Sequence, residues 1–228
     1  GILDNRIGEY YFPKHTTHVA AGNSPEDRAD VRDLPAPLAN RFEHIRFEHD
    51  IAEWSIWALD HEVMPEIVSF VNMNHDMLFK FDPNRDMTSF PSPRSVVFAD
   101  RLLKAHSGAP FLPEIVAGAT GHEWSAKFFA YLDIYKELPP IEGILSGKDK
   151  RVPARADLRY AAACLLAAKC APEHLEAVTR YALLLTGEQG IFLMQSIIRR
   201  PGLKQLIIKT PAFREWVKQH SDFLIEKE

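Results

Sequence analysis

Three side chains combine a phosphate-binding residue type with a position at the start or end of an expected element. Asn23 follows a β-branched run, Arg41 lies in a proline-started helix, and Arg94 lies in the first turn of a helix that begins after Ser92. An amide donates to phosphate oxygens and can orient a water molecule, and a guanidinium is a planar donor that is always charged. Groups of these types could therefore bind a phosphate or another anion.

Each of these residues also has a plainer interpretation. The Gly22-Asn23 pair is typical of a turn. Arg41 could be a surface residue whose neighbour Phe42 packs into the core. A cation in the first turn of a helix opposes the helix dipole at a cost of roughly 0.3–1 kcal/mol, so Arg94 is either a solvated side chain or part of an anion site with the free N–H groups there.

Two segments near the N-terminus have the pattern of strands. Residues 15–21 are rich in β-branched side chains, and residues 44–48 alternate, with Ile45 and Phe47 on one face. Alternation of this kind predicts a half-buried strand. A short helix that starts with proline, within residues 35–42, is expected between the two strands.

From Asp50 onward the pattern is helical. Asp50 is a predicted N-cap, with Glu53 at the capping-box spacing. The polar segment Gly143–Pro153 is the best candidate for a linker. Apolar periodicity and cap residues predict the remaining helices, which begin near Pro65, at Ser92-Pro93 and at Thr210-Pro211, or cover residues 123–135, 157–170, 174–185 and 188–199.

The composition is that of an ordinary globular protein, with 228 residues, 46% hydrophobic residues, 25% charged residues and a formal net charge of −4. Because there is no basic surplus to neutralise phosphates, nucleic-acid binding is disfavoured. The two cysteines, Cys164 and Cys170, favour a reducing compartment, and we expect a cytoplasmic protein. No apolar run is long enough for a bilayer, no signal peptide is visible, and no His/Cys cluster predicts a metal site.

Three short segments, taken in order, resemble parts of a MoxR-like AAA+ ATPase. Val19–Asn23 resembles the strand that ends in the sensor-1 residue. Leu34–Phe42 is similar to the segment that carries the arginine finger, and Phe90–Ser95 resembles the sensor-2 start of a lid helix. The similarity extends from Asp50 to about Tyr135 and is weaker beyond it.

The resemblance implies the roles of the candidate residues. Asn23 would be sensor 1, Arg41 the arginine finger that enters a neighbouring subunit, and Arg94 the sensor-2 residue that contacts the nucleotide. The implied fold is mainly α with a small β remnant: residues 1–49 from the C-terminal part of the α/β core, a helical lid over 50–145 and a helical extension over 146–228. The resemblance also implies a ring of copies of the chain, commonly a hexamer, and a von Willebrand factor A-domain partner.

One part of the family pattern is missing. The phosphate-binding loop, G-x-x-x-x-G-K-[ST], is absent from these residues, as is an apolar strand that ends in paired acidic residues for Mg²⁺. In an intact relative, these parts would precede Gly1. We therefore expect ATP and Mg²⁺ to be cofactors of the intact parent, which would remodel or mature protein complexes. We expect neither to bind this fragment tightly, and no ATP hydrolysis by this chain alone.

A second interpretation belongs to a different functional class. The chain could be a non-enzymatic helical module whose C-terminal helices bind a protein partner, with the AAA+ segments as inert relics or chance matches. The coding sequence upstream of Gly1 separates the two interpretations. A phosphate-binding loop there favours the ATPase, and a start codon directly before Gly1 favours the interaction module.

Overall fold

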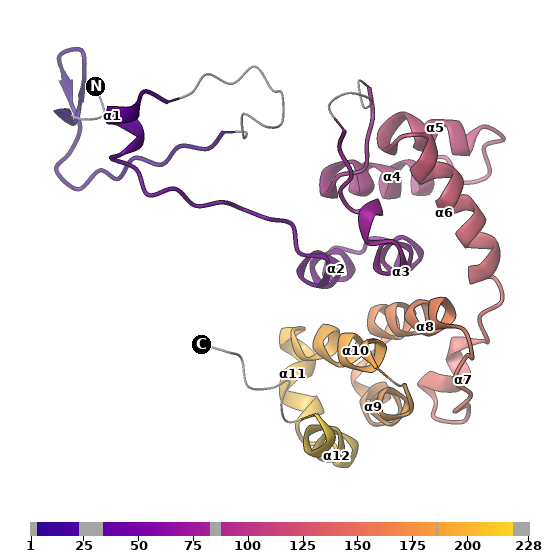
Figure 1. Ribbon diagram of the computed structural model, residues 1–228. Coiled ribbons are helices and arrows are strands. Elements are labelled where there is room, and N and C mark those ends of the chain that lie inside the picture. The colour runs from indigo at the N-terminus through magenta and orange to yellow at the C-terminus, as the bar shows by residue number, and fades with distance from the viewer. Residues whose placement is uncertain (1–3, 23–33, 83–87, 186, 221–228) are drawn as a thin grey trace. The chain divides into compact units, whose positions relative to one another are not determined.

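The structure is a computed structural model that describes residues 4–22, 34–82, 88–185 and 187–220 (Figure 1). It is mainly helical, with 61% helix and 2% strand. The prediction of a mainly α protein with very little β structure is therefore confirmed. The chain forms two compact units, one from Gly1–Glu48 with Pro83–Arg85 and the other from His49–Asp82 with Asp86–Glu228.

The first unit has little regular structure in its described part. Strands β1 (Arg6–Ile7) and β2 (Tyr10–Tyr11) form an antiparallel hairpin in which Ile7 is opposite Tyr10. Gly8 has a φ of 58°, a left-handed conformation that glycine adopts easily, and it makes the turn between the two strands. Helix α1 (Ala36–Ala39) is the expected short helix, and it follows Pro35 as predicted.

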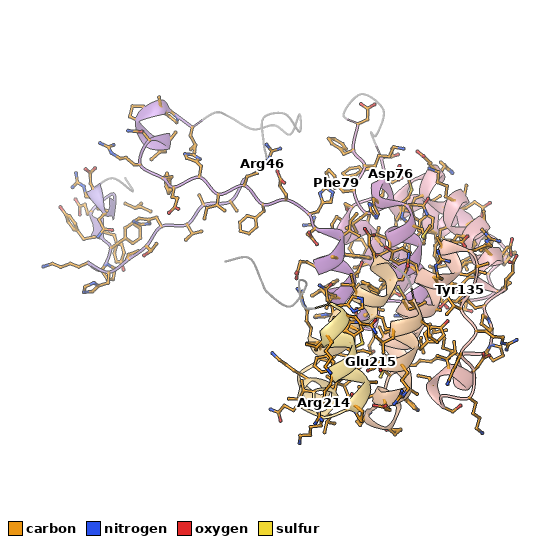
Figure 2. The ribbon with its side chains drawn as sticks, turned by 60° about the horizontal axis from the view of Figure 1, so that its bottom comes forward. Arg46, Asp76, Phe79, Tyr135, Arg214 and Glu215 are labelled. Atoms are coloured by element: carbon orange, nitrogen blue, oxygen red, sulfur yellow. The ribbon has the colours of Figure 1, made fainter. Side chains whose placement is uncertain are left out.

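The predictions of strands over residues 15–21 and 44–48 were wrong. Neither segment is a strand in the structure. Ile45 and Phe47 are 70% and 92% exposed rather than half-buried, and Arg46 lies on this extended segment (Figure 2). A strand requires a neighbour that takes up its N–H and C=O groups, and no described residue provides one.

The first half of the second unit begins at Asp50. The Asp50 carboxylate accepts the Glu53 N–H at 2.7 Å, which confirms the predicted N-cap. The Glu53 carboxylate pairs with Arg199 instead of completing the capping box. The elements of this half are α2 (Ile51–Asp60), α3 (Pro65–Met73), η3 (His75–Met77), α4 (Pro93–Ala105), α5 (Leu112–Thr120) and α6 (His122–Tyr135).

The second half of this unit is also helical. Thr210 caps the last helix, since its hydroxyl oxygen accepts the Phe213 N–H at 3.3 Å, as predicted. The predicted linker, residues 143–153, begins inside a helix whose Ile144 is fully buried. The elements are α7 (Ile141–Leu145), α8 (Ala156–Lys169), η4 (Pro172–His174), α9 (Leu175–Leu184), α10 (Glu188–Ile198), α11 (Pro201–Ile207) and α12 (Pro211–Gln219).

One hydrophobic core runs through the second unit, from Trp54 on α2 to Trp216 on α12. Residues 50–145 and 146–228 therefore share a core, in which α3 packs against α8. Phe70 makes edge-on contacts with the rings of Trp124 and Phe128 at centroid distances of 5.3 and 5.4 Å. Such ring pairs add to the burial of apolar area that stabilises this unit.

Two pairs of aromatic residues, Trp54 with Trp57 and Phe128 with Phe129, differ in their burial. Trp54 and Phe128 are buried, and Phe129 packs partly buried against the core. Trp57 is 43% exposed and stacks on His61, with 4.3 Å between the ring centroids. The helix period explains the difference, because Trp57 lies about 300° around α2 from Trp54, at the edge of the buried face.

Both cysteines are buried, free thiols. Burial raises the pKa of the Cys170 thiol to about 11 and that of Cys164 further. Because the thiolate is the reactive form, neither residue is poised for chemistry. Among the described residues, no helix combines the length and the apolar character needed to span a membrane.

Candidate functional site

Arg41 lies on a tight turn that directly follows α1. The backbone N–H of Arg41 donates to Leu38 O at 3.1 Å, and that of Phe42 donates to Ala39 O at the same distance. The His44 imidazole donates through Nε2 to Ala39 O at 2.9 Å. His44 therefore acts as a positioning residue, because it joins the chain after Arg41 to the last residue of α1.

The Arg41 side chain is exposed and has no hydrogen-bond or ion-pair partner in the described part of the chain. Its neighbour Phe42 is only partly buried, so it does not anchor the turn in a hydrophobic core. An open hollow lies beside this turn, lined by Ala36, Pro37, Ala39, Asn40, Phe42 and His44. The guanidinium is thus available to an anion outside the first unit.

Arg94 lies in the first turn of α4, as predicted, and the helix start is fully capped. The Ser95 N–H donates to Ser92 Oγ at 3.1 Å, and the Ser92 N–H donates to Ser95 Oγ at 2.8 Å. These two donors are therefore already satisfied. An anion at this helix start would depend on the guanidinium and backbone N–H of Arg94, which is a weaker site than a bare helix N-terminus.

The chain that leads into α4 is fixed by nearby contacts. The Lys80 N–H donates to Pro91 O at 3.1 Å, and Ser95 Oγ donates to Phe90 O at 2.9 Å. The rings of Phe81 and Phe90 lie with their centroids 4.6 Å apart. These contacts hold the helix start, whereas the Arg94 side chain is exposed and has no partner within the described residues.

The outer face of α4 carries further exposed residues that residue type and spacing did not single out. Phe98 is 47% exposed, and the Arg101 guanidinium lies 5.8 Å from its ring centroid. With Arg94, these residues follow the i, i+4, i+7 spacing of one helix face. This spacing is visible in the sequence, but an aromatic residue such as Phe98 on a helix face usually indicates burial, so the sequence did not indicate an exposed face.

The structure does not gather the three predicted site residues within one unit. Asn23 lies outside the described residues, Arg41 belongs to the first unit and Arg94 to the second. In the described ranges, no group of three or more His, Cys, Asp or Glu side chains could hold a metal ion. Searches of protein-family profiles, of curated proteins and of solved structures found no match to this chain.

Proposed function

We propose that this chain is the C-terminal part of a MoxR-like AAA+ ATPase and supplies its sensor and arginine-finger side chains. Residues 1–49 would belong to the α/β core, 50–145 to the lid and 146–228 to a helical extension. One observation carries the proposal: Arg41 presents an exposed guanidinium with no partner in the described part of the chain, on a turn that the His44 hydrogen bond fixes. A guanidinium without a partner among these residues suits an anion on another subunit.

In this proposal, Arg41 donates N–H groups to the terminal phosphate of ATP held by a neighbouring subunit. Asn23 orients the attacking water, and Arg94 contacts the same phosphate or its neighbour. Water attacks the terminal phosphorus, and the bond from this phosphorus to the bridging oxygen breaks. Mg²⁺ and a phosphate-binding loop, where present, neutralise charge and hold the nucleotide.

A finger supplied to a neighbour requires a repeated head-to-tail interface, and such an interface forms a ring when the rotation between neighbours closes. A hexamer and a von Willebrand factor A-domain partner belong to the same proposal, as does a role in remodelling or maturing protein complexes. So does a cytoplasmic location, which the two free thiols support.

The exposed apolar residues of the first unit support the assignment to an α/β core. Val19, Ile45 and Phe47 are 90%, 70% and 92% exposed. Extended segments that carry such side chains and lack hydrogen-bonded neighbours are expected where a sheet is completed by other polypeptide. The second unit, by contrast, has a complete core of its own.

The test is Mg·ATP turnover by a polypeptide that joins this chain to the coding sequence preceding Gly1. Removal of an arginine finger costs roughly 10³–10⁵ in kcat, so Arg41→Ala should lower kcat by at least about 10³ and leave ATP binding nearly unchanged. Arg46→Ala is the matched control, because Arg46 is also an exposed arginine of the first unit. It should retain full turnover.

Three results would contradict the proposal. One is an Arg41→Ala variant with unchanged kcat, and another is an upstream coding sequence without a phosphate-binding loop. The third is ATP turnover above a no-protein control by residues 1–228 alone, because the proposal leaves this chain without a nucleotide-holding loop.

The second candidate function is a helical module that binds a protein partner without catalysis. The shared core from α2 to α12 favours it, because the second unit has a hydrophobic core of its own. A start codon directly before Gly1 and full retention of partner binding in Arg41→Ala would support this alternative over the ATPase.

A further inference from the structure

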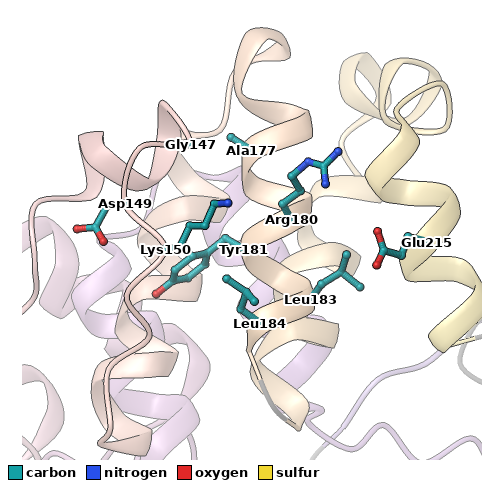
Figure 3. Close-up of a pocket in the computed structure, with 9 residues that line it drawn as sticks. All are labelled: Gly147, Asp149, Lys150, Ala177, Arg180, Tyr181, Leu183, Leu184 and Glu215. Carbon is teal, nitrogen blue, oxygen red and sulfur yellow. The ribbon is translucent and has the colours of Figure 1, made fainter.

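The second unit contains a cleft that none of the predicted site residues lines. It crosses the outer face of α9, between the loop after α7 on one side and α12 on the other (Figure 3). Its lining combines small, apolar and charged residues: Gly147, Asp149, Lys150, Ala177, Arg180, Tyr181, Leu183, Leu184 and Glu215.

The walls of the cleft are held in place by contacts outside it. Tyr181 Oη donates to the Arg151 carbonyl oxygen at 3.1 Å, which ties the loop to α9. Gly147 has a φ of 73°, and a Cβ at this position would lie 3.4 Å from the Ala177 Cβ. On the other side, Glu176 Oε2 accepts the Ala212 N–H at 3.2 Å and so ties α9 to the start of α12. The cleft is therefore a fixed feature of the fold.

The size of the cleft limits what can occupy it. Its volume is about 210 Å³. Sites for small molecules and cofactors typically measure roughly 300–1,000 Å³. A nucleotide is too large for this cleft, whereas one or two side chains from another protein surface fit.

The charges that line the cleft are of two kinds. Asp149 is engaged by Arg151, whose Nε lies 3.0 Å from Oδ1 and whose Nη2 lies 2.6 Å from Oδ2. This pairing lowers the pKa of the Asp149 carboxyl to about 2. Arg180 is paired with Glu176, with 2.6 Å between Nη2 and Oε1. These charges are neutralised within the chain and attract a partner only weakly.

Lys150 and Glu215 form the second kind. Both are exposed, and neither has an ion-pair partner within the residues that the structure describes. Figure 3 shows them on opposite sides of α9, with Arg180, Leu183 and Leu184 on the helix between them, and Figure 2 shows Glu215 beside Arg214 on α12. Leu184 is 44% exposed. The cleft therefore offers one free cation and one free anion on either side of an exposed apolar side chain.

We propose that this cleft is the contact surface of a two-fold symmetric dimer of the chain. In such an interface the same patch is used by both copies, and residue i meets residue j twice. Lys150 of one copy faces Glu215 of the other, the reciprocal pair forms on the far side of the axis, and the two Leu184 side chains pack between them. A second copy presents a carboxylate to Lys150 and an ammonium group to Glu215. An acidic or a basic partner would pair with only one of the two, and this charge complementarity favours a second copy.

The dimer is expected to be weak. Stable protein interfaces bury about 1,200–2,000 Å² in total, whereas this cleft has a volume of only about 210 Å³ and nine lining residues. Exposed ion pairs also add little individually, but symmetry doubles each of them. The dimer should therefore form in a concentration-dependent manner and weaken at high salt.

Sedimentation equilibrium of the 228-residue chain tests the proposal through a charge swap. Lys150→Glu and Glu215→Lys each place like charges opposite one another twice, and each should raise the dimer dissociation constant about tenfold. The double variant, Lys150→Glu with Glu215→Lys, restores opposite charges across the axis and should return the constant to within about threefold of the original value. A residue with a purely structural role would not show this rescue.

Two further variants complete the experiment. Lys204→Glu reverses an exposed lysine of α11 that has no described ion-pair partner, and it should leave the dissociation constant unchanged. Leu184→Glu should abolish the dimer. Circular dichroism melting of every variant checks that the fold is intact, since all of these side chains are exposed.

Two outcomes would overturn the proposal. One is a chain that remains monomeric up to about 1 mM. The other is a double variant that stays as weak as the single ones, which would place the contact elsewhere or with a different partner. The dimer does not depend on the proposed ATPase, because Arg41→Ala should leave its dissociation constant unchanged.

Discussion

The Asp100 carboxylate on α4 accepts the backbone N–H of Met64, the residue before α3, with 2.9 Å between Oδ1 and N. Its other oxygen, Oδ2, lies 2.8 Å from Lys104 Nζ, and Lys104 also donates to the Glu62 carbonyl oxygen at 2.5 Å. Asp100 is buried, so this contact fixes the helix that carries Arg94 to the turn between α2 and α3.

Replacement of Asp100 should therefore weaken the second unit. Asp100→Ala leaves the Met64 N–H without its acceptor and should lower the free energy of unfolding by about 1–3 kcal/mol. Urea unfolding followed by tryptophan fluorescence measures the change. Asp76→Ala is the control, because it removes an exposed ion pair with Lys80 and should cost less than about 1 kcal/mol. Equal losses for the two variants would contradict the importance of the Met64 contact.

Gly190 is a position where a single methyl group should be costly. A Cβ at Gly190 would lie 2.7 Å from the Ala182 carbonyl oxygen and 3.1 Å from that of Leu185, and both are backbone atoms. Gly190→Ala should therefore push α10 from α9 and lower the free energy of unfolding by about 1–3 kcal/mol.

The matched control for Gly190→Ala is Gly118→Ala, which is expected to change the free energy of unfolding in the opposite direction. Gly118 lies within α5 and would meet no atom within 4 Å on gaining a Cβ. Because alanine has a higher helix propensity than glycine, Gly118→Ala should raise the free energy of unfolding by up to about 1 kcal/mol. If both variants shifted the urea midpoint in the same direction, the close approach of α9 and α10 would not explain the Gly190 effect.

Arg94 should be unfavourable for stability. It is the only charged residue in the first turn of α4, and a cation there opposes the helix dipole. Arg94→Glu should raise the free energy of unfolding by about 0.3–1 kcal/mol, as thermal unfolding at low salt would show. In an ATP-hydrolysing parent, the same change should lower turnover. Such a trade-off is expected of a residue retained for binding rather than for folding.

Arg101 provides the comparison on the same helix face. It lies beyond the first turn of α4, and its guanidinium rests over the Phe98 ring. Arg101→Glu removes a cation–π contact worth about 0.5–1 kcal/mol and should lower stability by up to that amount. Destabilisation by Arg94→Glu as well would mean that the guanidinium of Arg94 has a folding role.

Acid should weaken the start of α6. Hydrogen bonds from Lys127 and Lys80 lower the pKa of the Glu123 carboxyl from 4.5 to about 2. A carboxyl whose pKa is lower in the folded state stabilises the protein above its unfolded pKa, and this contribution disappears as the pH falls toward the folded pKa. The wild-type chain should therefore lose more stability than Glu123→Gln between pH 4.5 and about 2.

The difference should stay below about 1 kcal/mol, because the Glu123 side chain is 52% exposed and solvent screens the ion pairs. Urea unfolding at stepped pH measures it. Glu114→Gln is the matched control, since Glu114 lies in the first turn of α5 and has no described ion-pair partner. Its pH profile should follow that of the wild-type chain. Parallel profiles for wild type and Glu123→Gln would show that the lysine pairs add nothing.

Local signals in the sequence were sufficient for most of the helices. Asp50 and Thr210 accept N–H groups at the starts of their helices, and Pro65, Pro93 and Pro211 occupy first helical positions. A cap, a proline and an apolar stripe act over one or two turns of chain, so these features can be recognised without knowledge of the rest of the fold.

Local sequence signals predicted only part of the candidate site. The sequence placed Arg94 in the first turn of a helix, and that position is confirmed. It placed Arg41 inside a short proline-started helix, which was wrong, because α1 ends at Ala39 and Arg41 lies on the turn that follows. It did not show that Ser92 and Ser95 already satisfy the N–H groups beside Arg94, or that His44 fixes the turn of Arg41. Those details depend on how side chains are oriented, which residue type and spacing do not specify.

By itself, the sequence determined that the chain is mainly helical and where most helices begin. Only the tertiary structure decided that residues 15–21 and 44–48 are not strands, that Trp57 is exposed, and that Lys150 and Glu215 lie on opposite sides of α9. Helix hydrogen bonds join residues that are four apart, so a short stretch of sequence is enough to predict a helix. Strand pairing, burial and clefts depend on contacts between segments that are distant along the chain. These contacts stabilise the protein only after the segments have come together.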